Sequence, residues 1–140
     1  MPQEILAVLR RTAAANPLVR VVEFCPEPVW FVRDAERVVI MGGYNSVCEA
    51  LSFEKPALIV PRIKPRAEQL IRAEAMRAVG VVDVLHPDQL STQALTRWLA
   101  AERPRPTVHG RINLSGLAAL PTMFQRLMGD SRSPVAVAEV

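Results

Sequence analysis

The sequence predicts an α/β fold in which a parallel β-sheet is flanked by helices. Short apolar runs rich in β-branched residues alternate with segments whose apolar residues recur at three- and four-residue spacing, the pattern of amphipathic helices. Runs that are apolar at nearly every position are typical of strands buried on both faces, and parallel strands need helical crossovers between them. Most of the twelve prolines fall between these segments, where proline ends regular structure.

The predicted elements follow one another along the chain. They are helix 4–15, strand 19–24, helix 29–35, strand 37–41, helix 45–53, strand 57–60, helix 66–79, strand 81–85, helix 91–101 and helix 114–128. Asn16-Pro17 ends the first helix, Gly80 suits a left-handed turn after the fourth, and Ser91 is a preferred N-cap for the fifth. Pro121 is expected to break the last helix.

The composition is that of a soluble globular chain. Of its 140 residues, 50% are apolar and 22% are charged. No apolar run approaches the roughly 18 residues that a membrane span needs, and the N-terminus lacks the pattern of a signal peptide. Two cysteines without a secretion signal suggest reduced thiols. We therefore expect a cytoplasmic protein, which a basic surface would also allow to lie peripherally at the inner face of the membrane.

The charge balance favours an anionic partner. Lysine and arginine together number 17 against 14 acidic residues, which gives a net charge of +3. Aromatic residues are only 5% of the chain and no nucleic-acid-binding motif is present, so we do not expect nucleic acid as the partner. Cys25, Cys48, His86 and His109 show no metal-ligand spacing, and we predict neither a metal site nor a cofactor.

Two loops of the predicted sheet carry the candidate site. Gly42-Gly43 follows one strand and the basic segment from Arg62 follows the next, so both leave the carboxyl edge of a parallel sheet, where ligands bind. Glycines allow close approach to the backbone, and the N-terminus of the next helix favours a phosphate. Glu49 is placed to accept hydrogen bonds from a ribose diol, and Gln69 to bind sugar hydroxyls.

Simpler interpretations exist for the same residues. Ser46-Val-Cys-Glu49 matches the capping box, in which Glu49 would only bind the Ser46 amide. A lone pair of glycines is a weak signal, and the cations after the second strand are compatible with a solvated loop. Tyr44 is compatible with simple packing, and Arg72 is expected to face water.

The stretch "ERVVIMGGYNSVCEALSFEKPALIVPRIKPRAEQLIRAEAMRAVG" carries a family resemblance. It resembles the C-terminal donor-binding domain of GT-B glycosyltransferases, and in particular the MurG-like N-acetylglucosaminyltransferases and their bacterial relatives. The resemblance covers about residues 19–100. The matching residues are Gly42, Gly43, Asn45, Ser46, Glu49, Lys55-Pro56, Pro61, Glu68-Gln69 and Arg72-Ala73.

The resemblance implies a Rossmann-like sheet and a nucleotide-sugar donor, UDP-N-acetylhexosamine or UDP-hexose, used for hexosyl transfer. Gly42, Gly43 and the amides of Asn45 and Ser46 would face the diphosphate. Glu49 would hold the ribose. The residues expected at the donor sugar and at the edge of the site are Gln69, Glu68 and Arg62. No residue suggests a general base, so we predict no catalytic residue.

The chain departs from the family pattern in two ways. Glu54 stands where the family has glycine, and a glutamate would be strained there if the backbone needs a positive φ. The four predicted strands correspond to the last four of six, and the N-terminal acceptor domain is missing. We therefore expect an incomplete C-terminal half of a GT-B fold, with Met1-Pro2 at an internal position of a longer protein.

A truncated chain of this kind is expected to be a fragment, a mis-started reading frame or one subunit of a split enzyme. Its open strand edge predicts a marginal, aggregation-prone or obligately partnered molecule, and the partner would be an N-terminal GT-B domain or subunit. The predicted divisions are a partial donor-binding domain at 1–102, a linker at 103–113, a helix at 114–128 and a mobile tail at 129–140.

Three other functions fit the same sequence. One is a relative of UDP-N-acetylglucosamine 2-epimerase, whose site also combines glycines with a glutamate. Another is a non-catalytic subunit or regulatory module of a split glycosyltransferase. The last is general binding of anions or RNA, which would show a steep salt dependence that substitution of Glu49 leaves unchanged.

Overall fold

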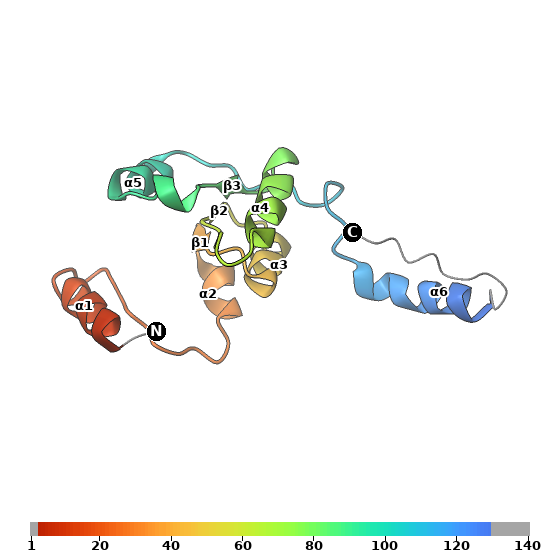
Figure 1. Cartoon of the computed structure of the whole chain (residues 1–140), viewed down its shortest axis with the longest axis horizontal. Coiled ribbons are helices and arrows are strands. Elements are labelled where there is room, and N and C mark those ends of the chain that lie inside the picture. Colours follow the sequence, from red (N-terminus) through yellow and green to blue (C-terminus); the bar gives the residue numbers. More distant parts are fainter. Residues whose placement is uncertain (1–2, 130–140) are drawn as a thin grey trace. The chain divides into compact units, whose positions relative to one another are not determined.

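The computed structural model describes residues 3–129 and divides the chain into two compact units, Met1–Phe31 and Val32–Val140 (Figure 1). The first unit contains helix α1, Gln3–Ala14. Its apolar stripe, Ile5, Val8 and Leu9, is more than two-fifths exposed at each position. Helix α1 is therefore amphipathic as predicted, but no residue of this helix is buried.

The predicted strand at residues 19–24 is wrong, because this segment forms no strand in the structure. A strand exists only as part of a hydrogen-bonded ladder, and the described part of the first unit offers no neighbouring strand. The segment stays irregular, with Leu18 and Phe24 exposed and Glu23 ion-paired to Arg10 of α1. Helix α2, Val29–Asp34, follows it.

The second unit is built on a parallel sheet of three short strands. Strands β1 (Val38–Ile40), β2 (Ala57–Ile59) and β3 (Asp83–Val84) lie in the order β1-β2-β3. The register pairs Val39 with Leu58 and Leu58 with Asp83. The predicted α/β class, with parallel strands and flanking helices, is confirmed for this unit, which uses three of the four predicted strands.

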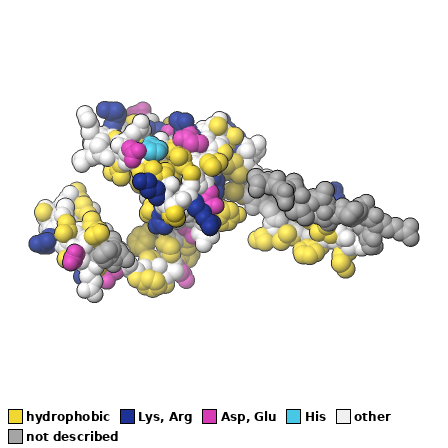
Figure 2. Space-filling model, in the orientation of Figure 1, with side chains coloured by type: hydrophobic (Ala, Val, Ile, Leu, Met, Phe, Trp, Pro, Cys, Tyr) yellow, Lys and Arg dark blue, Asp and Glu magenta, His cyan; other side chains and the backbone are white. Residues whose placement is uncertain are grey.

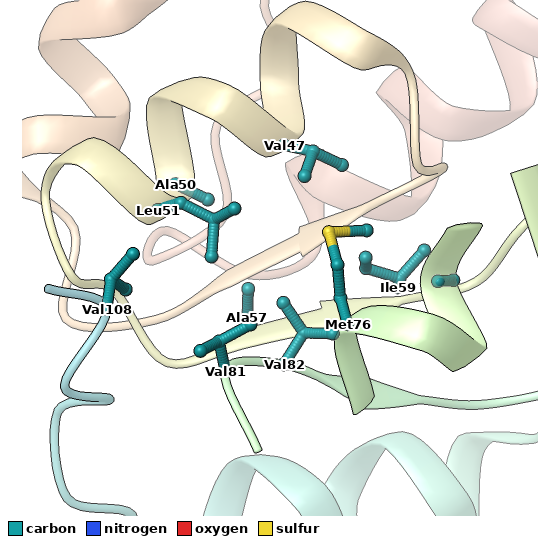
Figure 3. Close-up of a cluster of buried hydrophobic side chains, with 10 residues drawn as sticks. Val47, Ala50, Leu51, Ala57, Ile59, Met76, Val81, Val82 and Val108 are labelled. Carbon is teal, nitrogen blue, oxygen red and sulfur yellow. The ribbon is translucent and has the colours of Figure 1, made fainter. Parts of the chain in front are cut away.

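Helices α3 (Tyr44–Ser52) and α4 (Glu68–Ala78) cover one face of the sheet. Their side chains meet alternate residues of β2 and the residues that lead into β3, and Figure 3 shows them converging between the ribbons. The buried cluster consists of Val47, Ala50, Leu51, Ala57, Ile59, Ala73, Met76, Val81, Val82 and Val108. This face is the core of the unit.

The opposite face is covered only in part. The short 3₁₀ helix η1, Pro87–Gln89, and helix α5, Thr92–Ala100, follow β3. Trp98 of α5 is buried, and its indole N–H donates to Asp83 Oδ2 at 2.8 Å. Because Leu58 and Asp83 share a register, this contact covers β2 and β3, while Val39 on the same face of β1 stays 47% exposed.

Several predicted helix boundaries are confirmed. The Ser91 hydroxyl accepts from the Ala94 amide at 3.1 Å and caps α5, and Gly80 has a φ of +71° just after α4.

The predicted break at Pro121 is wrong, because α6 runs without interruption from Gly116 to Gly129. Proline lacks one amide hydrogen and costs one backbone hydrogen bond, which here does not end the helix.

The segment that follows α5 contributes to the core of the second unit. Val108, within the segment predicted as a linker, is 1% exposed and belongs to the core. Arg103 pairs with Asp83, and the Arg111 guanidinium donates to the Val79 carbonyl at 3.0 Å.

The predicted mobile tail lies almost entirely outside the described residues. In the part of the chain that the structure describes, no helix has the length and apolar character of a membrane span.

Candidate functional site

The turn after β1 needs glycine at its first position. Gly42 has a φ of +82°, and a Cβ built there would lie 3.0 Å from Ile59 Cγ2. A side chain at this position would meet both a strained backbone and the core. Gly43 differs, because it has a φ of −59° and a Cβ there would meet nothing within 4 Å. The open space therefore lies at Gly43.

Helix α3 begins directly after this turn, with Gly43 as its N-cap and no side chain capping it. The Val47 amide donates to the Gly43 carbonyl at 3.0 Å. The amides of Tyr44, Asn45 and Ser46 precede that bond and so have no acceptor inside the helix. Uncapped amides and the positive end of the helix dipole together make a place where an anion is stabilised.

The capping-box interpretation of Glu49 is wrong. A capping box requires Ser46 to be the N-cap, whereas Ser46 is the third residue of α3 and the cap is Gly43. The Glu49 side chain is half-buried, and among residues 3–129 no hydrogen bond or ion pair engages its carboxylate. Glu49 is thus an acceptor whose bonding capacity the described structure does not use.

The loop after β2 meets the Gly42 turn, as the sequence predicted for neighbouring parallel strands. Gln69, in the first turn of α4, accepts a hydrogen bond from the Arg62 amide at 3.0 Å through Oε1. A Cβ built at Gly42 would lie 3.8 Å from the Gln69 Cβ. Gly42, Arg62 and Gln69 are therefore neighbours, and the Gln69 amide nitrogen keeps two N–H donors for another partner.

The side chains of the other predicted site residues make no described contact with Gly42 or Gln69. Glu68 is the first residue of α4 and is exposed, and so are the side chains of Asn45 and Arg62. Each lies at or beside a helix start or loop of the same sheet edge. The described contacts do not bring Glu68 or Glu49 against Gln69.

The sequence did not indicate that Arg72 contributes a positive charge to this edge. Arg72 of α4 was expected to face water, but it is half-buried and its guanidinium carbon lies 5.9 Å from the centroid of the Tyr44 ring. This cation–π contact places a positive charge beside the start of α3. No local signal could have shown it, because the contact depends on how α3 and α4 pack.

An apolar groove of about 630 Å³ opens beside the same edge, lined by the ends of β1 and β2, the loop after β2, η1 and the start of α5. Arg62 and Lys64 stand among its lining residues, and the apolar ones include Val39, Met41, Ile63, Leu90 and Leu95. Figure 2 shows how apolar and basic side chains mix over the second unit, and how apolar side chains follow α6.

No group of three or more histidine, cysteine, aspartate or glutamate side chains within residues 3–129 could hold a metal ion. Cys25 and Cys48 are free thiols. The arrangement at the carboxyl edge of β1 and β2 therefore combines backbone amides, glycines, cations and the carboxylates of Glu49 and Glu68. Comparison with models of known protein families and with curated proteins found no match for this chain.

Proposed function

We propose that the second unit binds a nucleotide-activated sugar, UDP-N-acetylhexosamine or UDP-hexose, as the donor half of a GT-B glycosyltransferase. The observation that carries the proposal is the uncapped start of α3 after Gly42-Gly43, placed next to Arg62 and Gln69. The residue pattern of the sequence supports the same assignment.

The diphosphate would lie at the α3 start. Three amides without helical acceptors and the space over Gly43 leave room for phosphate oxygens to approach the backbone. Arg62 and Arg72 would add positive charge near the turn, and Arg72 is held by its contact with the Tyr44 ring. Phosphate bound to amides and guanidinium groups has strong, charge-assisted hydrogen bonds.

Glu49 and Gln69 would bind the sugars. Side chains of a helix point back towards its N-terminus, so a carboxylate in the second turn of α3 can reach a group seated at the first. Its two oxygens suit the two hydroxyls of ribose. Gln69, already oriented by the Arg62 amide, would donate to the donor sugar, with Glu68 beside it.

The proposal includes hexosyl transfer only in combination with a second domain or subunit. A transferase needs a group that removes a proton from the acceptor, and none of the residues that line this edge is assigned that role. The acceptor site and the general base would come from the partner. This chain would bind and orient the donor.

The test is calorimetric titration of the chain with UDP-N-acetylglucosamine, comparing Glu49→Gln with Glu102→Gln. Both variants lose one carboxylate, but Glu102 is exposed and distant in sequence from the α3 start. We expect Glu49→Gln to weaken binding about tenfold, ~1.4 kcal/mol, because it removes a charged acceptor. Glu102→Gln should bind as the unmodified chain does.

The same titration separates the other functions. No heat of binding for the unmodified chain, under conditions where its thermal unfolding is cooperative, would overturn the proposal. RNA binding that falls steeply with salt and ignores Glu49→Gln would favour a general anion site. Conversion of UDP-N-acetylglucosamine into its 2-epimer would favour the epimerase relative.

A further inference from the structure

Strand β1 is an edge strand with unused backbone hydrogen-bonding groups. The Val38 amide donates to the Pro56 carbonyl at 3.0 Å, and the Ile40 carbonyl accepts from the Val60 amide at 2.8 Å. In a parallel ladder, alternate residues point to the same neighbour, so the N–H and C=O of Val39 point away from β2. Within residues 3–129 no strand pairs with that side.

The edge lacks the features that normally protect one. Natural edge strands carry lysine, proline or a bulge, or are covered by another segment. Residues 38–41 are all apolar, and Val39 and Met41 are 47% and 57% exposed. The cation that directly precedes β1, Arg37, is engaged elsewhere, since its guanidinium donates to the carbonyls of Leu99 and Ala101 at 2.5 and 2.6 Å.

The other edge of the sheet is protected. Strand β3 has two residues, and one of them, Asp83, is held by the Trp98 indole and the Arg103 guanidinium. A short strand with an occupied charged side chain offers little to a further strand. Association through the sheet is therefore directed to β1.

We propose that β1 docks against β1 of a second copy, antiparallel, so that the two sheets join across a two-fold axis. Val39 of each copy would form a hydrogen-bonded pair with Val39 of the other, because its free N–H and C=O face the edge. The two exposed valine side chains then lie side by side on the groove face. Helices α3 and α4 of both copies cover the opposite face.

A second copy fits this edge better than residues 19–24, the segment that was predicted to form a strand. In residues 19–24, Arg20 and Glu23 are three positions apart, so in a strand they would point to opposite faces. In either orientation, one of these two charges would lie on the face that α3 and α4 bury. Glu23 is also engaged by Arg10. Residues 38–41 of a second copy carry no charge, and one pairing satisfies both edges.

The proposal is tested by the mass of the full chain in sedimentation velocity across the micromolar range. We expect twice the 15.5 kDa of one chain at the upper end. Val39→Pro removes the outward N–H without touching the bonds to β2 and should give the monomer mass. The matched control Val22→Pro, in the irregular segment, should remain a dimer. A monomer at all concentrations, or a dimer lost only in Val22→Pro, would overturn the proposal.

Two further variants guard against a folding defect. Val39→Lys keeps the backbone and places two like charges across the axis, so it should also be monomeric with an unchanged circular dichroism spectrum. In a Cys25→Ser, Cys48→Ser background, Val39→Cys should be joined into dimers by a short bis-maleimide. Joining of Val39→Cys chains to Val22→Cys chains, without joining of Val39→Cys to itself, would instead assign the edge to residues 19–24.

Discussion

Two adjacent glycines of the β1–α3 turn have different tasks. Gly42 is fixed by its φ of +82° and by Ile59, whereas Gly43 has an ordinary φ and only open space around its Cβ position. The first glycine serves the fold. The second leaves open space over the start of α3.

Alanine at each position should therefore have opposite effects. Gly42→Ala should lower the free energy of unfolding by about 1–2 kcal/mol, because its Cβ is strained and crowded. Gly43→Ala should leave the free energy of unfolding unchanged or slightly raised, but weaken the proposed binding of UDP-N-acetylglucosamine, because the methyl group would fill the proposed phosphate position. Urea denaturation and calorimetric titration check the two effects. Equal losses of stability in both variants would contradict this division.

Glu54 also has two tasks. It occupies the left-handed region, with a φ of +49°, a conformation that glycine adopts more easily than glutamate. Its side chain offsets the strain by accepting a hydrogen bond from the Val108 amide at 3.2 Å, with His109 Nδ1 at 3.6 Å. The residue thus joins the α3–β2 turn to the segment after α5.

This contact predicts a pH dependence. The bond from the Val108 amide, and then His109, hold the pKa of Glu54 below its ordinary value of 4.5. A lowered pKa in the folded state means that the stabilisation is complete above pH 4.5 and is lost as the pH falls through the folded-state pKa. Thermal midpoints measured from pH 6 downwards should fall less steeply in Glu54→Gln. The same slope in both proteins would exclude this role.

At the scale of elements, the segment 103–113 behaves as part of the second unit. Val108 fills the core between α3 and the residues that lead into β3, and Arg111 bonds the carbonyls at the end of α4 (Figure 3). An arginine at the C-terminus of a helix stabilises it by satisfying free carbonyls. The segment therefore closes the core at the amino-terminal edge of the sheet.

Truncation of Val108 tests whether this closure matters. Val108→Ala should lower the free energy of unfolding by about 2 kcal/mol, because it leaves a cavity in a buried site. The control Leu117→Ala, on α6, removes a side chain that is 84% exposed and should change stability by less than about 0.5 kcal/mol. Similar small effects in both would mean that residues 103–113 do act as a free linker.

At the scale of the whole molecule, the proposed donor site and the proposed dimer edge use different atoms of the same strand. The donor would bind beyond the carboxyl end of β1, and a second copy would bind along its side. Binding of the donor and association of the chain should therefore be separable. The first unit takes part in neither proposal.

The chain by itself should bind the donor without consuming it. We expect UDP-N-acetylglucosamine incubated with the chain to release UDP at the uncatalysed rate, because the proposed function assigns the general base to the partner domain and not to this edge. Chromatographic measurement of free UDP checks this. Release of UDP faster than the uncatalysed rate, if it is lost in Glu49→Gln, would show that the described residues do include a catalytic group.

The sequence by itself determined the elements that depend on local chemistry. Apolar periodicity and turn residues predicted all the helices from α1 to α6, the Ser91 cap and the left-handed Gly80. They also predicted that Gly42 and Gln69 come together, because the carboxyl ends of adjacent parallel strands share an edge.

Only the tertiary structure decided the features that depend on a partner distant in sequence. Residues 19–24 have strand composition, yet a ladder needs a neighbour, and none is described for them. Arg72 reaches Tyr44 and Glu54 reaches Val108 only because of how the elements pack. The start of α3 at Tyr44, which frees Glu49 from a capping box, depends on a backbone cap at Gly43 that has no side-chain signal. Local preferences are short-range energies, whereas pairing and packing are settled by the whole fold.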